Sequence, residues 1–177
     1  AILAGEEAAG AVNAQKSADT DAATGVYRAE ALLARLDKQM ESARLKQVPL
    51  SVLCIQLDQV AMLREASGEV GAIAGLRPVA ELLLEEIEYG DVLGRSGPDG
   101  FLVLAPGRRL LQAREYAERL RSAVNRLRID PRVATSLSVS IGVAQAGAQE
   151  RSPAGIVERA NRAAQIALKN GGNQIFS

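Results

Sequence analysis

The chain has 177 residues and is 47% hydrophobic, which is enough apolar sequence to fill one core and suggests a single domain. Its 21 lysines and arginines balance 21 aspartates and glutamates, so no summed charge favours nucleic acid or an anionic membrane as a partner. The absence of histidine excludes histidine general bases, histidine metal ligands and Ser-His-Asp triads.

The cysteine usage and the N-terminus indicate the setting of the chain. The single cysteine, Cys54, lies in an apolar run and is predicted to be a buried, inert thiol, which suits a reducing, cytoplasmic compartment. No apolar run approaches the roughly 20 residues of a membrane span. Because the chain begins without methionine or a basic targeting region, we interpret it as a domain excised from a longer protein. Residues 1–20, rich in alanine without a helical stripe, are expected to connect it to an upstream domain.

The first regular elements are a helix and a buried strand. From Val26 to about Lys46, apolar residues recur at the three-and-four spacing of one helical face. The dipeptide Val48-Pro49 ends this helix. The continuous apolar run Leu50–Leu57 that follows is typical of a central strand covered on both faces.

Helical periodicity returns after this strand but is interrupted. Residues 59–67 suit a short helix, and residues 68–71 form a break with glycine at both ends. A second amphipathic stretch extends to about Ile87 and contains Pro78. Because an internal proline costs about 3 kcal/mol, we expect this helix to begin near Leu76, the alternative being a kink at the proline.

The second half of the chain starts with a hairpin. The apolar residues Val92-Leu93 and Phe101–Leu104 flank a turn with the sequence Ser96-Gly97-Pro98-Asp99-Gly100. An amphipathic helix is predicted from Arg108 to Leu127, and the alternation over Leu137–Ala144 predicts a half-buried strand.

A last helix and a short strand complete the chain. Ser152 is a typical N-cap and Pro153 a typical first helical residue. Residues 170–172, Asn-Gly-Gly, end the helix before a short strand at residues 174–176. The whole order predicts an α+β fold in which helices flank a mostly antiparallel central sheet.

Four features in this order resemble the GGDEF family of diguanylate cyclase domains. They are an Asp21-x-x-Thr24-Gly25 opening, a strand ending in Gln56-Leu57-Asp58, the hairpin, and the segment Ser140–Ala144. The resemblance covers residues 21–177 and implies a ferredoxin-like palm fold. It also implies an enzyme in which two facing domains each hold one GTP, with divalent metals bound by two carboxylates.

The residues at the family's metal-binding and hairpin positions depart from this chemistry. Gln56 corresponds to the first metal-binding acid, whereas Asp58 remains as the second acid of that segment. The Gly-Gly-Asp-Glu-Phe motif corresponds to Gly97-Pro98-Asp99-Gly100-Phe101. Pro98 removes an N–H donor, and Gly100 removes the glutamate side chain. We interpret Asp99 as a turn residue rather than a metal ligand.

The remaining family positions also differ. Arg64 and Ile73 correspond to the asparagine and aspartate that bind guanine in the family, and Leu168 and Gly172 to its phosphate-binding lysine and arginine. The Arg-x-x-Asp motif of the inhibitory product site corresponds to Glu88 and Asp91. A glutamate there would repel the product's phosphates.

We therefore predict a catalytically inactive GGDEF-like domain that needs no metal or cofactor. It would act as a regulatory, relay or dimerisation module of a larger bacterial cyclic-di-GMP signalling protein, beside sensor and EAL domains. A pilus or motility regulator is one setting, by analogy. The alternative is a non-catalytic GTP-binding sensor that controls a neighbouring EAL domain, supported by Asp58, Asp99 and the Gly97 turn. The sequence leaves homodimer formation open.

Overall fold

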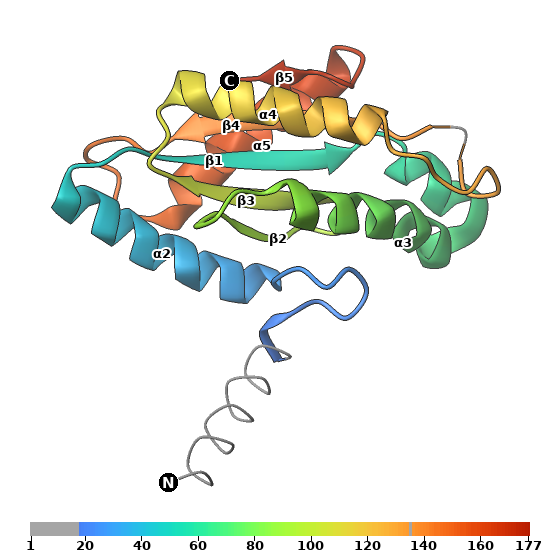
Figure 1. Ribbon diagram of the computed structural model, residues 1–177, viewed down its shortest axis with the longest axis horizontal. Helices are drawn as coiled ribbons and strands as arrows, with labels where there is room; N and C mark the ends of the chain where they lie inside the picture. Colours follow the sequence, from blue (N-terminus) through green and yellow to red (C-terminus); the bar gives the residue numbers. More distant parts are fainter. Residues whose placement is uncertain (1–17, 135) are drawn as a thin grey trace, which may run out of the picture.

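The protein is described by a computed structural model over residues 18–134 and 136–177. Nearly all of the predicted connector, residues 1–20, therefore lies outside the described residues. The fold is a sheet sandwiched between helices (Figure 1). Its elements are α2 (Ala29–Lys46), β1 (Leu50–Leu57), α3 (Val60–Glu86), β2 (Val92–Ser96), β3 (Gly100–Pro106), α4 (Leu110–Asn125), β4 (Val139–Gln145), α5 (Pro153–Lys169) and β5 (Ile175–Phe176).

The sheet has five strands in the order β2-β3-β1-β4-β5. Central β1 pairs antiparallel with β3 on one side and with β4 on the other, and β2 pairs antiparallel with β3. The short β5 pairs in parallel with β4. This arrangement confirms the predicted α+β fold with a mostly antiparallel sheet.

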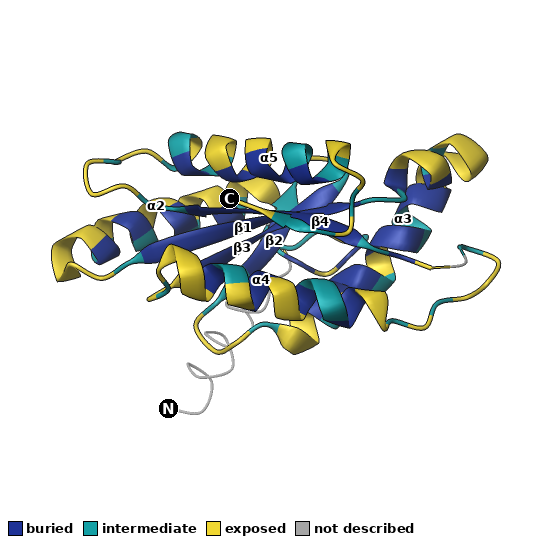
Figure 2. Ribbon diagram, turned by 90° about the horizontal axis from the view of Figure 1, so that it is seen from above, coloured by how far each residue is buried: buried dark blue, intermediate teal, exposed yellow. Residues whose placement is uncertain are grey.

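Alternating residues of β1 enter two separate hydrophobic cores. Leu53, Ile55 and Leu57 pack with residues of α3 and α4, whereas Val52 and Cys54 pack with residues of α2 and α5. Figure 2 shows the layers, with α5 and α4 on opposite sides of the sheet. The predicted burial of Cys54 is confirmed, and this burial raises the pKa of its thiol.

The prediction that the third helix begins near Leu76 is wrong. The expected short helix and break are confirmed, because α3 consists of two helices that meet at Ser67 and Gly68, whose φ and ψ are non-helical, but the second helix begins directly after Gly68. The expected break is therefore shorter than residues 68–71, and Pro78 lies well inside the second helical part. Burial of Leu76, Val79, Ala80 and Leu83 against the sheet offsets the cost of the proline, which local propensity alone overstates.

The prediction of a half-buried β4 is also wrong, because six of its seven residues are buried. The face that carries Ser140 and Gly142 is covered by α5, which approaches so closely that a Cβ on Gly142 would lie 2.0 Å from the carbonyl oxygen of Ala160. Small residues alternating with large ones therefore marked a close helix contact rather than a solvent-facing side.

The remaining boundaries agree with the sequence to within a few residues. The first predicted helix starts at Ala29 rather than Val26, because Tyr27 instead pairs with the edge of β2, accepting from Arg95 N at 2.8 Å. The predicted start of α5 is confirmed, since the hydroxyl of Ser152 accepts from Ala154 N at 3.3 Å.

Candidate functional site

The candidate site lies where the tip of the β2–β3 hairpin meets the C-terminal end of β1. Gly100 pairs with Gln56 on β1 and with Ser96 on β2. The amide of Leu57 donates to the carbonyl of Asp99 at 3.3 Å. The fold thus brings together the two segments that sequence analysis assigned to metal and phosphate binding.

Gln56 and Gly100 fill this junction without offering a carboxylate. The Gln56 side chain is 7% exposed, and its amide nitrogen lies 3.6 Å from Cys54 Sγ. A Cβ on Gly100 would lie 2.1 Å from the Ile55 carbonyl and 3.0 Å from Gln56 Nε2. A side chain at position 100 would therefore force the strands to move apart at this point.

Arg64, from the first turns of α3, reaches the hairpin tip. Its Nη2 lies 2.7 Å from Oδ1 of Asp99, and its Nε lies 2.5 Å from Oε1 of Glu69. Nη2 and Oδ1 are shielded from solvent and form an ion pair rather than a well-aligned hydrogen bond. The hydrogen bond to Glu69 and the contact with Asp99 raise the pKa of Arg64. The acid that remains in the hairpin motif is thus paired with a cation of the same chain.

The same arginine spans the break in α3. Arg64 precedes the break and Glu69 follows it, and Gly68 between them has a φ of +64°, which favours glycine. Ile73, the other residue at a predicted guanine position, is partly buried and packs against the core shared with α3 and α4. Of this predicted pair, only Arg64 is joined to the hairpin.

Asp58 ties three segments of the chain together. Its carboxylate accepts hydrogen bonds from the hydroxyls of Ser138 and Ser140, both at 2.6 Å, and from Asn173 N at 2.8 Å. Gly172 lies against the same carboxylate, because a Cβ there would be 3.0 Å from Asp58. These contacts use Asp58 to hold β1, the start of β4 and the turn before β5, a role that sequence analysis missed.

The hairpin tip is also tied to the turn at Asp21. Arg95 Nη2 donates to the Pro98 carbonyl at 2.7 Å, and its Nη1 lies 3.6 Å from Oδ2 of Asp21. The same Oδ2 accepts from the backbone N and the hydroxyl of Thr24, at 3.2 and 2.6 Å. The Asp-x-x-Thr-Gly opening is therefore a closed turn that contacts the tip through one arginine.

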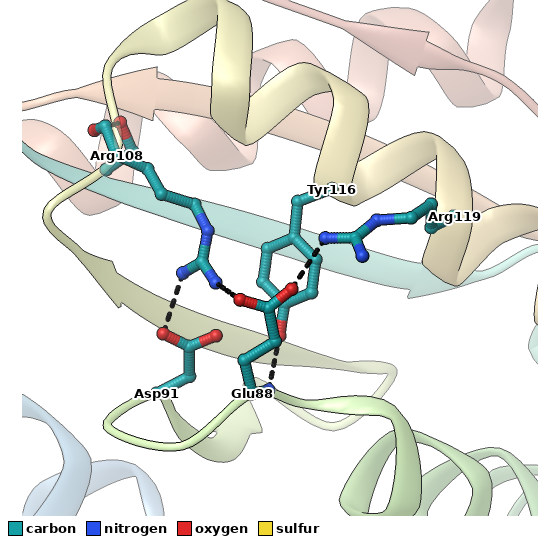
Figure 3. Close-up of polar contacts among 6 residues, drawn as sticks. Glu88, Asp91, Arg108, Tyr116 and Arg119 are labelled. Carbon is teal, nitrogen blue, oxygen red and sulfur yellow. Dashed lines mark hydrogen bonds and ion pairs between the residues drawn. The ribbon is translucent and has the colours of Figure 1, made fainter.

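Glu88 and Asp91, at the predicted product site, belong to a cluster of charges (Figure 3). Arg108 donates to Asp91 Oδ1 at 2.7 Å and also to the Glu88 carboxylate. Arg119 donates to Glu88 at 2.7 Å. Two arginines thus offset the charge of Glu88, which weakens the expected repulsion of phosphates, and the hydrogen bonds from Arg119 and Arg108 lower the pKa of Glu88.

Tyr116 lies beneath this cluster. The guanidinium carbon of Arg108 lies 4.2 Å from the centre of the Tyr116 ring, and the Tyr116 hydroxyl accepts a hydrogen bond from Glu88 N at 3.3 Å. Burial, and then the Asp91 carboxylate, raise the pKa of Tyr116. Sequence analysis missed Arg108, Tyr116 and Arg119. Their partners Glu88 and Asp91 lie 17 to 31 positions earlier in the chain, and no short-range sequence pattern links residues so far apart.

In residues 18–134 and 136–177, no group of three or more His, Cys, Asp or Glu side chains could hold a metal ion. Over the same ranges, no helix is long and apolar enough to cross a membrane.

A sequence model of one family, "Diguanylate cyclase, GGDEF domain", matches residues 18–174. The chain belongs to the GGDEF family. The resemblance stated from its motifs is therefore confirmed. Similar curated proteins include Response regulator PleD of Caulobacter vibrioides, 27% identical over 159 residues, and the uncharacterized protein Rv1354c of Mycobacterium tuberculosis, 27% identical over 160 residues. They match 88% and 89% of this chain, which spans only 35% and 25% of their own lengths.

Solved structures share the fold over most of the chain. The FimX GGDEF domain of Pseudomonas aeruginosa is 27% identical, with a TM-score of 0.80 over 89% of this chain and 98% of that one. The coiled coil and GGDEF domain of DgcB from Caulobacter crescentus, solved in complex with c-di-GMP, is 18% identical. It has a TM-score of 0.86 over 99% of this chain and 93% of that one, a likeness of fold.

Proposed function

We propose that this is a catalytically inactive GGDEF domain that serves as a regulatory, relay or dimerisation module of a larger bacterial cyclic-di-GMP signalling protein. An adjacent sensor domain, a following EAL domain and a cytoplasmic setting are parts of the same proposal. The much greater length of the curated relatives supports a multidomain protein.

The ion pair between Arg64 and Asp99 carries the proposal. A cyclase needs carboxylates free to hold divalent metals against the phosphates. Here Asp99 faces a guanidinium at 2.7 Å, and Gln56 supplies an amide rather than a charge. A cation built into the chain opposes the entry of a second cation at the same carboxylate. The residues of this junction are therefore better suited to a structural role than to catalysis.

A relay role is supported by the contacts on the other side of the tip. Arg95 joins Pro98 to the Asp21 turn, and Arg77 Nε donates to the Ala23 carbonyl at 3.0 Å. A displacement of the residues that precede Asp21 would thus act on both the hairpin tip and α3. In the full-length protein, we expect Arg95→Gln to weaken the response of the neighbouring output domain without unfolding this one.

The GTP-sensor alternative has less support than the sequence alone gave it. Two of its three features were the acids Asp58 and Asp99, and both carboxylates are engaged within the chain. Its remaining feature is the Gly97 turn, which has a φ of +63°.

Product formation tests the inactivity directly. The purified domain is incubated with GTP and Mg²⁺, and cyclic-di-GMP is quantified by chromatography beside an active GGDEF domain. We expect no product from this domain at any concentration at which the active domain turns over. Synthesis of cyclic-di-GMP above the protein-free background would overturn the proposal.

A further inference from the structure

A pocket of about 470 Å³ lies at the end of β1 away from the hairpin tip. The eight residues of β1 separate it from the hairpin junction by on the order of 20 Å. It is formed by the C-terminal end of α2, the start of β1, the residue before α4 and the segment after β4. Its lining includes Met40, Arg44, Pro49, Arg109, Ala146 and Glu150.

The walls of this pocket are joined by backbone hydrogen bonds. Gly107 N donates to the Pro49 carbonyl, and Ala146 N donates to the Leu50 carbonyl, both at 2.8 Å. The first amide of α4, Leu110 N, donates to Oε1 of Gln145 at 2.8 Å. The cavity is thus preformed by the fold, within the size range of small-ligand sites.

Two cations line the pocket from different elements. Arg44 belongs to the last turn of α2, and Arg109 directly precedes α4. Among residues 18–134 and 136–177, neither guanidinium has an acidic partner. The acid of the lining, Glu150, is already bound by Arg159 at 2.5 Å and by Gly147 N at 3.0 Å. Among the lining residues the charge without an ion-pair partner is therefore positive, although Arg44 also borders a neighbouring hollow lined by Asp37 and Glu41.

We propose that this pocket binds a small organic anion with an apolar body and a carboxylate or phosphate group. The anionic group would lie between Arg44 and Arg109, each of which can donate charge-assisted hydrogen bonds. The apolar body would contact Met40, Pro49 and Ala146. A site of this kind is independent of the hairpin junction.

Calorimetric titration of the domain with phenyl phosphate and with benzoate tests the proposal. We expect saturable binding of at least one of them, with the preferred probe identifying phosphate or carboxylate as the recognised group. Benzyl alcohol, which lacks the charge, should not bind. Arg44→Gln and Arg109→Gln should each weaken the affinity about tenfold.

Arg126→Gln is the matched control, because Arg126 is an exposed arginine at the far end of α4 whose side chain contacts Ser122. It should leave the affinity unchanged. Absence of binding by both anions up to millimolar concentrations, or equal affinity in the Arg44→Gln/Arg109→Gln double variant, would overturn the proposal. Because Arg64 and Asp99 play no part, a failure here and a failure of the inactivity proposal are separate results.

Discussion

Glycine has opposite consequences at the two places where this sheet is most tightly built. Between β4 and α5, Gly142 lets a helix lie directly on a strand, with a would-be Cβ only 2.0 Å from the Ala160 carbonyl. At the hairpin junction, Gly100 stands where the family has its glutamate, and β1 closes against it. The first glycine lets α5 pack on the sheet, and the second leaves no side chain at the candidate site. Close approach of backbone therefore supports the fold at one glycine and restricts the candidate site at the other.

The largest expected effect breaks the scaffold side of this comparison. Gly142→Val places its Cβ 2.0 Å from Ala160 O and 2.3 Å from Ala164 N, both backbone atoms that cannot move without shifting α5. We expect a loss of at least about 3 kcal/mol in the free energy of unfolding, or failure to fold. Urea denaturation measures it.

Gly147→Ala is the control, since the nearest atom to its new Cβ would be 3.7 Å away. It should change the unfolding free energy by less than about 0.5 kcal/mol. A Gly142→Val protein as stable as this control would show that the contact between β4 and α5 is less rigid than described.

The next effect concerns the hairpin junction. Gly100→Glu restores the family residue but brings its Cβ to 2.1 Å from the Ile55 carbonyl. We expect a loss of about 2 kcal/mol in stability and no cyclic-di-GMP synthesis. Pro98→Gly, at the exposed turn, should cost less than about 1 kcal/mol and likewise yield no product. Full stability of Gly100→Glu would contradict the close approach of the strands.

Asp58→Ala tests whether this acid is structural. Removing the carboxylate leaves the hydroxyls of Ser138 and Ser140 and the amide of Asn173 without their acceptor. We expect a loss of about 2 kcal/mol in the free energy of unfolding. Asp37→Ala, at an exposed acid of α2, is the control and should change it little. Equal stability of the two variants would show that the Asp58 carboxylate does not stabilise the fold and is available for another role.

The sequence predicted well the features that depend on local patterns. The apolar run of β1 and the Ser152-Pro153 start of α5 can each be recognised from a few consecutive residues. The continuation of α3 past Pro78 cannot be recognised in this way. The free-energy cost of the proline is offset by packing against residues of the sheet that are distant in sequence. The sequence likewise did not predict that α5 covers the small-residue face of β4, because the two elements meet only in the folded protein.

The candidate site was predictable in position but not in its contacts. Aligned motifs brought Gln56, Gly100 and Asp99 to one junction, as the strand register places them. The ion pair of Asp99 joins it to Arg64, 35 positions earlier, and no spacing rule predicts that distance. The charges around Glu88 likewise depend on arginines beyond the hairpin.

The smallest effect is a dependence on pH. Arg119 and Arg108 hold the pKa of Glu88 below its ordinary value of 4.5, so its stabilising contribution is present above that value and is lost as pH falls through the folded-state pKa. Because the Glu88 side chain is 47% exposed, we expect less than about 1 kcal/mol. Glu88→Gln should show less acid destabilisation than the wild type, whereas the exposed-site control Glu81→Gln should match the wild type. Identical acid profiles for all three proteins would contradict this assignment.

The most direct measurement of the central claim is calorimetric titration of the domain with GTP and Mg²⁺, beside a titration of Asp99→Ala. If Arg64 neutralises the remaining acid of the hairpin, neither protein binds GTP at millimolar concentrations. GTP binding by the wild type that is abolished in Asp99→Ala would contradict the account. Such a result would show that Asp99 gives up its ion pair with Arg64 and takes part in nucleotide binding.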